Sequence, residues 1–164
     1  AGVSAMAASP ANINDARRHL SVQTIGPDKL NQLRHLTFFG DIDGLRAHMA
    51  RVGELLKPKF SLVQEILERD LGGKDIATWS NPSGGYFVNV TGPDDCARPV
   101  IEMAAQAGVK LTPAGAPFAY GLDPQNRIIR LAPSFPPLED IRQAMEIFTL
   151  CLELVAIRQR LAKP

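Results

Sequence analysis

The clearest pattern along the chain is a stripe of apolar residues between positions 45 and 71. Large apolar side chains recur there every three or four residues, which places them on one face of an α-helix. The members of the stripe are Leu45, Met49, Val52, Leu56, Phe60, Val63, Leu67 and Leu71. Asp41 or Asp43 can cap the start of this helix, and the glycine pair after the stripe ends it. Pro58 has no N–H for the carbonyl of Glu54, so a bend is predicted at that point.

The proline inside the stripe also predicts where the chain divides. A long helix whose apolar face continues through a bend often connects two packed units. We therefore expect a boundary at Pro58. Residues 1–57 would belong to one domain, and residues 58–164 would form a second domain.

The segment before the long helix predicts one strand and two shorter helices. Residues 1–9 are small and apolar and predict a buried strand that Pro10 ends. Apolar residues at helical spacing favour a helix over residues 12–22, and residues 29–39 predict another that ends at Gly40. The first domain is therefore expected to be largely helical.

The second half of the chain alternates between strand-like and helical patterns. Strands are predicted within residues 78–90, 109–112 and 127–132, and helices over residues 97–107 and 137–161. The aspartate pair before the first of these helices is expected to cap it. The final helix is predicted to bury Leu138, Ile141, Met145, Phe148, Leu152, Val155 and Ile157. This alternation predicts an α/β chain whose second domain is α+β, with a short sheet covered by helices.

Composition and charge narrow the possible functions. The chain has 164 residues, of which 45% are hydrophobic and 21% charged, as in a folded globular protein. Lys and Arg together number 18 against 17 Asp and Glu, so the formal net charge is +1. This balance argues against a basic nucleic-acid-binding arm or an acidic tail, and no apolar run approaches membrane-spanning length. We therefore expect neither a nucleic acid nor a membrane as partner.

Two further features concern the origin and compartment of the chain. It does not begin with Met, and its opening residues lack the basic start of a signal peptide, so we expect it to begin within a longer protein. Cys96 and Cys151 lie far apart and form no CxxC pair. They predict buried, reduced thiols and hence a cytoplasmic location.

The motifs of a self-contained active site are absent from the sequence. It has no GxSxG, no GxxxxGK[ST] and no GxGxxG. The three histidines, His19, His35 and His48, share no short metal-ligand spacing, so no metal site is expected. We therefore expect no catalytic residue within the chain itself.

Three other segments carry possible binding chemistry. A glycine pair precedes an aromatic strand in residues 81–87 (NPSGGYF), where a bare backbone lets a ligand approach or simply forms a bulge. Residues 111–118 form a Pro/Gly-rich loop. Arg130 lies between apolar neighbours in a predicted strand, where its planar fork of donors suits a carboxylate. Spacing alone favours an internal salt bridge for this arginine over an anionic ligand.

These segments together resemble the C-terminal part of the fold-type I PLP-dependent aminotransferases. Residues 82–87 (PSGGYF) are similar to the family's P-x-G-G-x-F strand, and residues 104–114 to its A-x-x-x-G-V-x-x-x-P-G segment. Residues 126–134 (NRIIRLAPS) are similar to its N-x-I-R-L-x-x-S strand. Residues 25–35 further resemble a bacterial subgroup described as aspartate-aminotransferase-like. The resemblance spans essentially the whole chain.

The resemblance assigns roles to residues of both predicted domains. Residues 1–57 would be the C-terminal end of the PLP-binding large domain, and residues 58–164 the small C-terminal domain. Arg130 would bind the α-carboxylate of the amino-acid or 2-oxo-acid substrate, with Phe87 beside it and Gly85 leaving room for substrate. The enzyme would be a cytoplasmic homodimer of amino-acid metabolism.

The resemblance also implies where the cofactor, pyridoxal 5'-phosphate (PLP), is held. The lysine that binds PLP covalently would precede Ala1, so this chain alone is expected to be inactive and free of PLP. Lys29 and Asn31 could reach the cofactor phosphate of the partner subunit, and Ser4 is a further candidate. Val3 stands near the position where the family often has a phosphate-binding arginine, so phosphate binding is expected to differ here.

Other functions fit the same residues. The aminotransferase is the favoured function. A PLP-dependent lyase on the same fold would also use Arg130, and the aminotransferase-like ligand-sensing domain of a transcriptional regulator is a second alternative. A stand-alone interaction module, with Arg130 in an internal salt bridge, would be a stable monomer without affinity for amino acids. An aminotransferase fragment would instead expose apolar surface around Val3, Met6, Ile13 and Leu20 and would self-associate.

Overall fold

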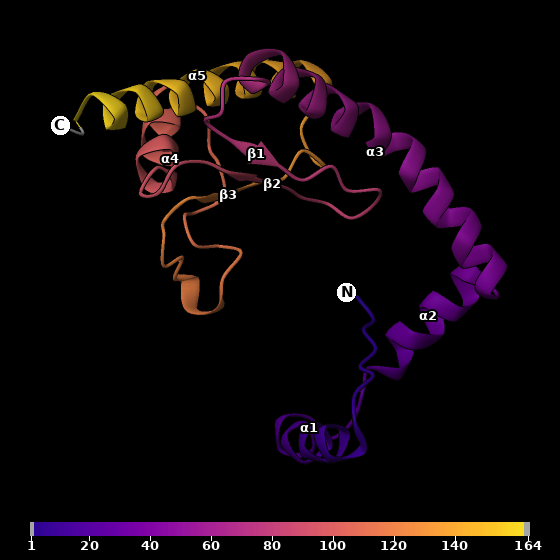
Figure 1. The fold of residues 1–164 in the computed structure, drawn as a ribbon. Coiled ribbons are helices and arrows are strands. Elements are labelled where there is room, and N and C mark those ends of the chain that lie inside the picture. The colour runs from indigo at the N-terminus through magenta and orange to yellow at the C-terminus, as the bar shows by residue number, and fades with distance from the viewer. Residues whose placement is uncertain (1, 163–164) are drawn as a thin grey trace. The chain divides into compact units, whose positions relative to one another are not determined.

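The computed structural model describes residues 2–162, which divide into two compact units, residues 2–52 and residues 53–162. Figure 1 shows the elements in chain order. They are α1 (Pro10–Gln23), α2 (Lys29–Phe39), α3 (Ile42–Leu71), β1 (Thr78–Trp79), β2 (Val88–Thr91), α4 (Ala97–Gln106), the 3-10 turn η1 (Ala119–Gly121), β3 (Ile128–Leu131) and α5 (Leu138–Ala162). Helix α3 contributes to both units, and the division falls within it, a few residues before Pro58.

Polar side chains fix the helix starts of the first unit. The Ser9 hydroxyl accepts a hydrogen bond from the Asn12 amide (3.3 Å), and the Asp28 carboxylate accepts one from the Asn31 amide (3.0 Å). Gly40 ends α2 with φ +72°, a conformation that favours glycine. The predicted helix over residues 29–39 is therefore confirmed, with the expected end.

The strand predicted for residues 1–9 is not formed. Residues 2–9 are exposed and have no strand pairing, and Pro10 begins α1 rather than ending a strand. The physical reason is that a strand needs a neighbour to satisfy its backbone groups, and the described part of this unit contains only helices. The pattern of small apolar residues therefore predicted neither the missing strand pairing nor the exposure of this segment.

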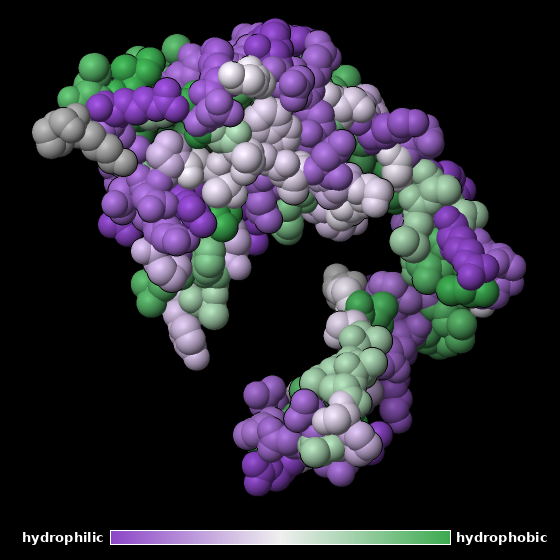
Figure 2. All heavy atoms as spheres, in the orientation of Figure 1, coloured by the Kyte–Doolittle hydropathy of each residue, from purple (hydrophilic) through white to green (hydrophobic). Residues whose placement is uncertain are grey.

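The first unit has no apolar core among its described residues. Asn31 is the one residue of this unit that is buried there. Figure 2 shows apolar side chains at the surface over α2 and the start of α3. The exposed ones include Leu20, Leu33, Leu36, Phe38, Ile42 and Met49.

The second unit is a three-stranded antiparallel sheet covered on one face by helices. The strand order is β1-β2-β3, so β2 is central, and Asn89 lies opposite Arg130 in the register of β2 and β3. Side chains alternate along each strand, and those facing the helices are buried: Val88, Val90, Ile129 and Leu131. Figure 1 shows the helices on one side of the sheet. The α+β expectation for this half is confirmed.

The core of the second unit joins the sheet to α3, α4 and α5. Phe148 of α5 and Ile66 of α3 are fully buried in it. Cys96 and Cys151 are buried and free, as predicted, and burial raises the pKa of the Cys96 thiol to about 11. Burial also raises the pKa of Cys151. Neither thiol is poised to act as a nucleophile at neutral pH.

The structure corrects several details of the predicted second half. Residues 109–112 are not a strand, although Thr112 lies beside β3 and its hydroxyl donates to the Arg130 carbonyl. Leu138 and Ile157 of α5 are exposed. Ile157 lies only two residues after the buried Val155 and therefore projects from another face of the helix, and Leu138 is the first residue of α5. The remaining members of the predicted inner face are buried.

The predicted aspartate cap of α4 is also wrong. Cys96 occupies the N-cap position without a side-chain hydrogen bond. Asn126, from the turn before β3, caps the helix instead. Its carbonyl accepts from the Ala97 amide (2.7 Å) and its side-chain oxygen from the Arg98 amide (3.2 Å). The start of α4 is thus tied to the start of β3, a long-range contact that no local pattern predicts.

Candidate functional site

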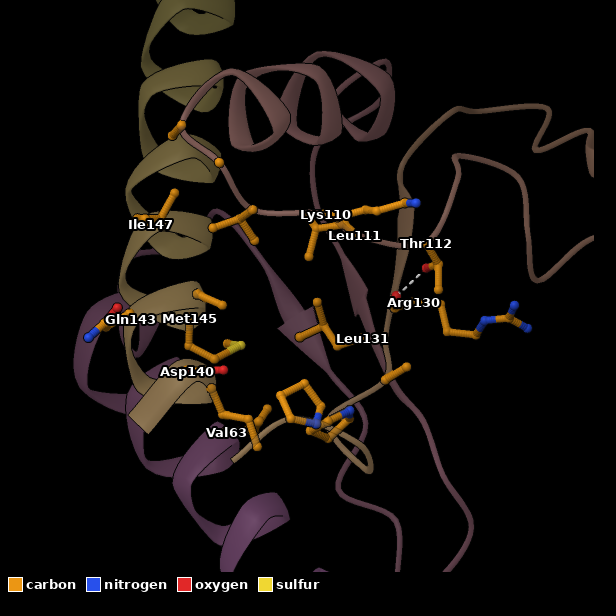
Figure 3. Close-up of a pocket in the computed structure, with 18 residues that line it drawn as sticks. Val63, Lys110, Leu111, Thr112, Arg130, Leu131, Asp140, Gln143, Met145 and Ile147 are labelled. Atoms are coloured by element: carbon orange, nitrogen blue, oxygen red, sulfur yellow. Dashed lines mark hydrogen bonds between the residues drawn. The ribbon is translucent and has the colours of Figure 1, made fainter. Parts of the chain in front are cut away.

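Arg130 extends from the sheet face opposite the helices. Figure 3 shows that Arg130 and its neighbour Leu131 leave β3 in opposite directions. Leu131 is buried in the core, whereas Arg130 is partly exposed. The alternation of a strand therefore directs this guanidinium away from the apolar interior.

The guanidinium of Arg130 has no anionic partner among residues 2–162. The ion pairs of the second unit involve Arg69, Lys74 and Arg127. Arg130 instead lies over the Phe87 ring, with its Cζ 4.4 Å from the ring centroid, and its Nε is buried without a hydrogen-bond partner. The internal salt bridge that spacing favoured is therefore wrong. A buried, unsatisfied donor on a fixed cation is suited to receive a carboxylate.

The other two predicted substrate-binding residues lie just before β2. Phe87 is 45% exposed and forms the cation–π contact with Arg130. Gly85 has φ +92°, and a Cβ placed there would meet no atom within 4 Å. The glycine is needed for its backbone conformation, and the space beside it is open. The structure thus brings Phe87 to Arg130 and leaves Gly85 at the turn that leads into Phe87.

Two residues that the sequence analysis did not single out hold the strand that carries Arg130. The Thr112 hydroxyl donates to the Arg130 carbonyl, as the dashed line in Figure 3 marks. The Asp123 carboxylate accepts from the backbone amides of Arg127 (2.8 Å) and Ile128 (2.9 Å). The Asp-Pro pair at 123–124 is a known turn signal that could have indicated this role.

The electrostatics of Asp123 follow from these contacts. Burial raises the pKa of its carboxyl, but backbone amides that donate to the carboxylate outweigh that effect. The net result is a pKa below the ordinary value of aspartate. Asp123 is therefore ionised at neutral pH and holds the entry to β3 as a charged acceptor.

Arg127, at the entry to the same strand, is already paired. Its Nη1 donates to the Asp94 carboxylate at 3.3 Å, although its Nε is buried without a partner. Since Arg127 has a carboxylate partner and Arg130 has none within the described residues, the two arginines are chemically distinct. Of these two arginines, Arg130 is the one available for an anionic ligand.

A pocket of about 490 Å³ lies on the helix side of β3. Its walls are largely apolar and come from α3, α5, residues 107–112 and the end of β3, with Val63, Leu131 and Met145 among them. Figure 3 shows that the Arg130 guanidinium points away from this pocket. Arg130 is still among the lining residues, so the pocket adjoins the part of β3 that carries this arginine.

The three residues predicted to contact PLP lie in the first unit and do not form a cradle for it. The Asn31 side chain is buried and donates to the Gly2 carbonyl at 2.9 Å, so it holds the start of the chain. Ser4 and Lys29 are exposed, and within residues 2–162 their side chains form no hydrogen bond. Their role in binding the cofactor stays a prediction.

Neither a metal site nor a membrane-spanning helix is found among the described residues. No group of three or more His, Cys, Asp and Glu side chains among residues 2–162 is arranged to hold a metal ion. No helix in that range combines the length and apolar character needed to cross a bilayer.

Comparison with known proteins identifies the group to which these features belong. Residues 1–163 match the sequence profile of the family described as aspartate amino-transferase. A relative from Mycolicibacterium smegmatis is 48% identical over 156 residues, covering 95% of this chain and 36% of its own length. An aspartate aminotransferase from Corynebacterium glutamicum is 41% identical over the same length, with the same coverage.

The fold is also found in a solved structure. The crystal structure of an aspartate transaminase from Corynebacterium glutamicum superposes with a TM-score of 0.82 and 40% identity, over 92% of this chain and 36% of that one. The chain therefore spans about 36% of the length of the curated relatives that it matches. The resemblance drawn from the three sequence motifs is confirmed.

Proposed function

Because the chain belongs to the aspartate amino-transferase family and corresponds to a C-terminal portion of a PLP-dependent aminotransferase, we propose that it supplies the substrate-carboxylate site of such an enzyme. The enzyme would move an amino group between an amino acid and a 2-oxo acid. The observation that carries this proposal is the Arg130 guanidinium, which has a buried unpartnered Nε and no carboxylate partner among residues 2–162.

Arg130 would bind the α-carboxylate that both substrates share. An amino acid and its 2-oxo acid differ at Cα but carry the carboxylate in the same place, so one arginine serves both directions of the transfer. A bidentate pair fixes the orientation of the substrate as well as its position. The Phe87 ring restrains the guanidinium, and the open space at Gly85 leaves room for the substrate.

The family implies PLP as the cofactor, which supplies an electron sink at the substrate Cα. In this proposal the covalently bound lysine lies in a part of the enzyme outside this chain, so the chain alone is inactive. Contacts from Ser4, Lys29 and Asn31 to the cofactor would be supplementary. Asn31 is already hydrogen-bonded to Gly2, and the other two side chains are exposed.

The proposed setting follows from the relatives and the cysteines. The Corynebacterium glutamicum relative is described as an aspartate aminotransferase, which makes aspartate and 2-oxoglutarate the first substrates to test. We place the enzyme in the cytoplasm as a homodimer. The reduced, buried state of Cys96 and Cys151 supports the compartment.

The experiment uses the complete gene product with added PLP. Aspartate and 2-oxoglutarate are supplied, and all products are quantified by NMR. The proposal predicts oxaloacetate and glutamate in equal amounts, and no reaction with an alkyl amine that lacks a carboxylate. Release of ammonia or of a cleaved side chain would instead show a lyase. Binding of amino acid without turnover would favour the ligand-sensing alternative.

A further inference from the structure

The residue opposite Arg130 in the sheet is Asn89. The register of β2 and β3 pairs the two directly. Directly opposite residues in an antiparallel pair project their side chains to the same face, with Cβ atoms about 4.5–5.5 Å apart. Asn89 is exposed, so its carboxamide lies on the face of the sheet from which Arg130 extends.

The side chain of Asn89 is not used by the fold. Its backbone amide donates to the Ser80 hydroxyl and its backbone carbonyl accepts from the Ser80 amide, each at 3.0 Å. Both contacts extend the pairing of β1 with β2 and would persist with any side chain at this position. The carboxamide itself forms no hydrogen bond within residues 2–162.

Asparagine is also a poor choice for this position on structural grounds. Asn89 lies in β2, the central strand of the sheet, between Val88 and Val90. Asparagine is depleted in strands, where β-branched residues are favoured. A residue that lowers the stability of a strand, and whose side chain has no structural contact, suggests a functional requirement.

We propose that Asn89 is a second carboxylate-binding residue that acts beside Arg130. This inference rests on the proposed function of Arg130. A bound carboxylate has two oxygens with about four acceptor sites, and a bidentate arginine occupies two of them. The Asn89 side-chain NH₂ donates to a remaining site. The ligand is the α-carboxylate of an amino acid or a 2-oxo acid.

The test compares variants of the complete enzyme in the aspartate and 2-oxoglutarate assay. Asn89→Val removes the carboxamide and introduces a residue that favours strands. We expect kcat/KM for both substrates to fall about 10- to 100-fold, as for loss of a hydrogen bond to a charged group. The midpoint of thermal unfolding is expected to rise by about 1–2 °C. If Asn89 were only a structural residue, Asn89→Val would not lower kcat/KM and raise the midpoint of thermal unfolding together.

Two further variants keep the test decisive. Asn89→Asp has nearly the same shape but places a carboxylate opposite Arg130, where it competes with the substrate. We expect a larger loss of kcat/KM than with Asn89→Val. Thr91→Val changes the next outward-facing residue of β2, opposite Ile128, and serves as the matched control with unchanged kinetics.

The outcomes separate this inference from the proposed function. If Arg130→Lys lowers kcat/KM while both Asn89 variants stay within twofold of the unmodified enzyme, the role of Asn89 is refuted and that of Arg130 stands. If Arg130→Lys also has no effect, the proposed function itself fails. Equal losses in Thr91→Val and Asn89→Val would overturn a specific role for Asn89.

Discussion

At the scale of single residues, the site depends on how differently two nearby arginines are placed. Arg127 and Arg130 enter and occupy the same strand, yet Arg127 is paired with Asp94 and Arg130 lies over Phe87. A cation over an aromatic ring keeps its hydrogen-bond donors available at its edge, whereas a salt bridge uses them. The Phe87 contact thus leaves the hydrogen-bond donors of Arg130 available, as the proposed carboxylate binding requires.

This arrangement predicts the effect of removing the ring. Phe87→Leu deletes the cation–π contact, which is worth about 0.5–1 kcal/mol at a partly exposed site. We expect KM for the amino acid to rise about two- to fivefold in the complete enzyme, with kcat less affected. Phe87→Tyr keeps the ring and is the control. An unchanged KM in the leucine variant would show that the ring does not restrain the arginine.

At the scale of elements, the turn before β3 organises the second unit. Asp123 holds the backbone amides of Arg127 and Ile128, and Asn126 caps α4. Asn126 adopts φ +46°, in the left-handed region that asparagine tolerates better than most residues. A single turn therefore fixes both the strand that carries Arg130 and the start of a core helix.

The lowered pKa of Asp123 predicts how this turn responds to pH. The native carboxyl binds its proton less readily than the unfolded one, whose pKa is about 3.9. Its contribution to stability is therefore present above that value and lost as pH falls through the native pKa. We expect Asp123→Ala to lower the free energy of unfolding by about 1–2 kcal/mol at pH 7, and by less below pH 4.

Urea unfolding of Asp123→Ala and of the unmodified protein at pH 7, 5 and 3.5 measures this difference in the free energy of unfolding. Glu102→Ala, at an exposed position of α4, is the control and should change stability little at any of these pH values. A difference between Asp123→Ala and the unmodified protein that does not shrink at low pH would contradict the role of the ionised carboxylate.

At the scale of the whole molecule, the two units differ in how they can be stable. The buried apolar residues of the described chain, from Leu62 to Ala156, all lie in the second unit. The first unit buries only Asn31 among its described residues and exposes large apolar side chains such as Phe38. Such a surface requires a partner to cover it, which supports the prediction that the isolated chain self-associates.

The distribution of the core predicts the behaviour of each unit alone. Residues 53–164 are expected to unfold cooperatively on heating, because they contain the sheet and its covering helices. Residues 1–52 are expected to show no cooperative transition. Trp79, the only tryptophan of the chain, is partly buried against the core and reports unfolding of the larger fragment by fluorescence. A cooperative transition in the 1–52 fragment would contradict this division.

The sequence predicted the helices well because their signals are local. The apolar stripe of α3, Asp28 before α2 and Gly40 after it each act within one or two turns. The failures involve partners distant in the chain. Residues 2–9 have no strand to pair with in their unit, and Asn126 rather than the nearby aspartates caps α4.

The candidate site shows the same limit. The strand pattern correctly placed Arg130 within a strand. Spacing alone could not exclude a salt bridge between Arg130 and a carboxylate from another element. Only the fold shows that no carboxylate is paired with Arg130 among residues 2–162. The register that sets Asn89 opposite Arg130 depends on how two distant strands align. The proposed role of Arg130 came from the resemblance of the motifs, because the local pattern did not indicate it.

Carboxylate binding by Arg130 is tested most directly by comparing Arg130→Lys with Arg127→Lys in the complete enzyme. Lysine keeps the charge but cannot form the bidentate pair. We expect Arg130→Lys to lower kcat/KM for amino-acid and 2-oxo-acid substrates by about 100-fold or more, and Arg127→Lys to change it by less than about threefold. Equal effects of the two substitutions, or full activity in Arg130→Lys, would contradict the assignment of Arg130 as the carboxylate anchor.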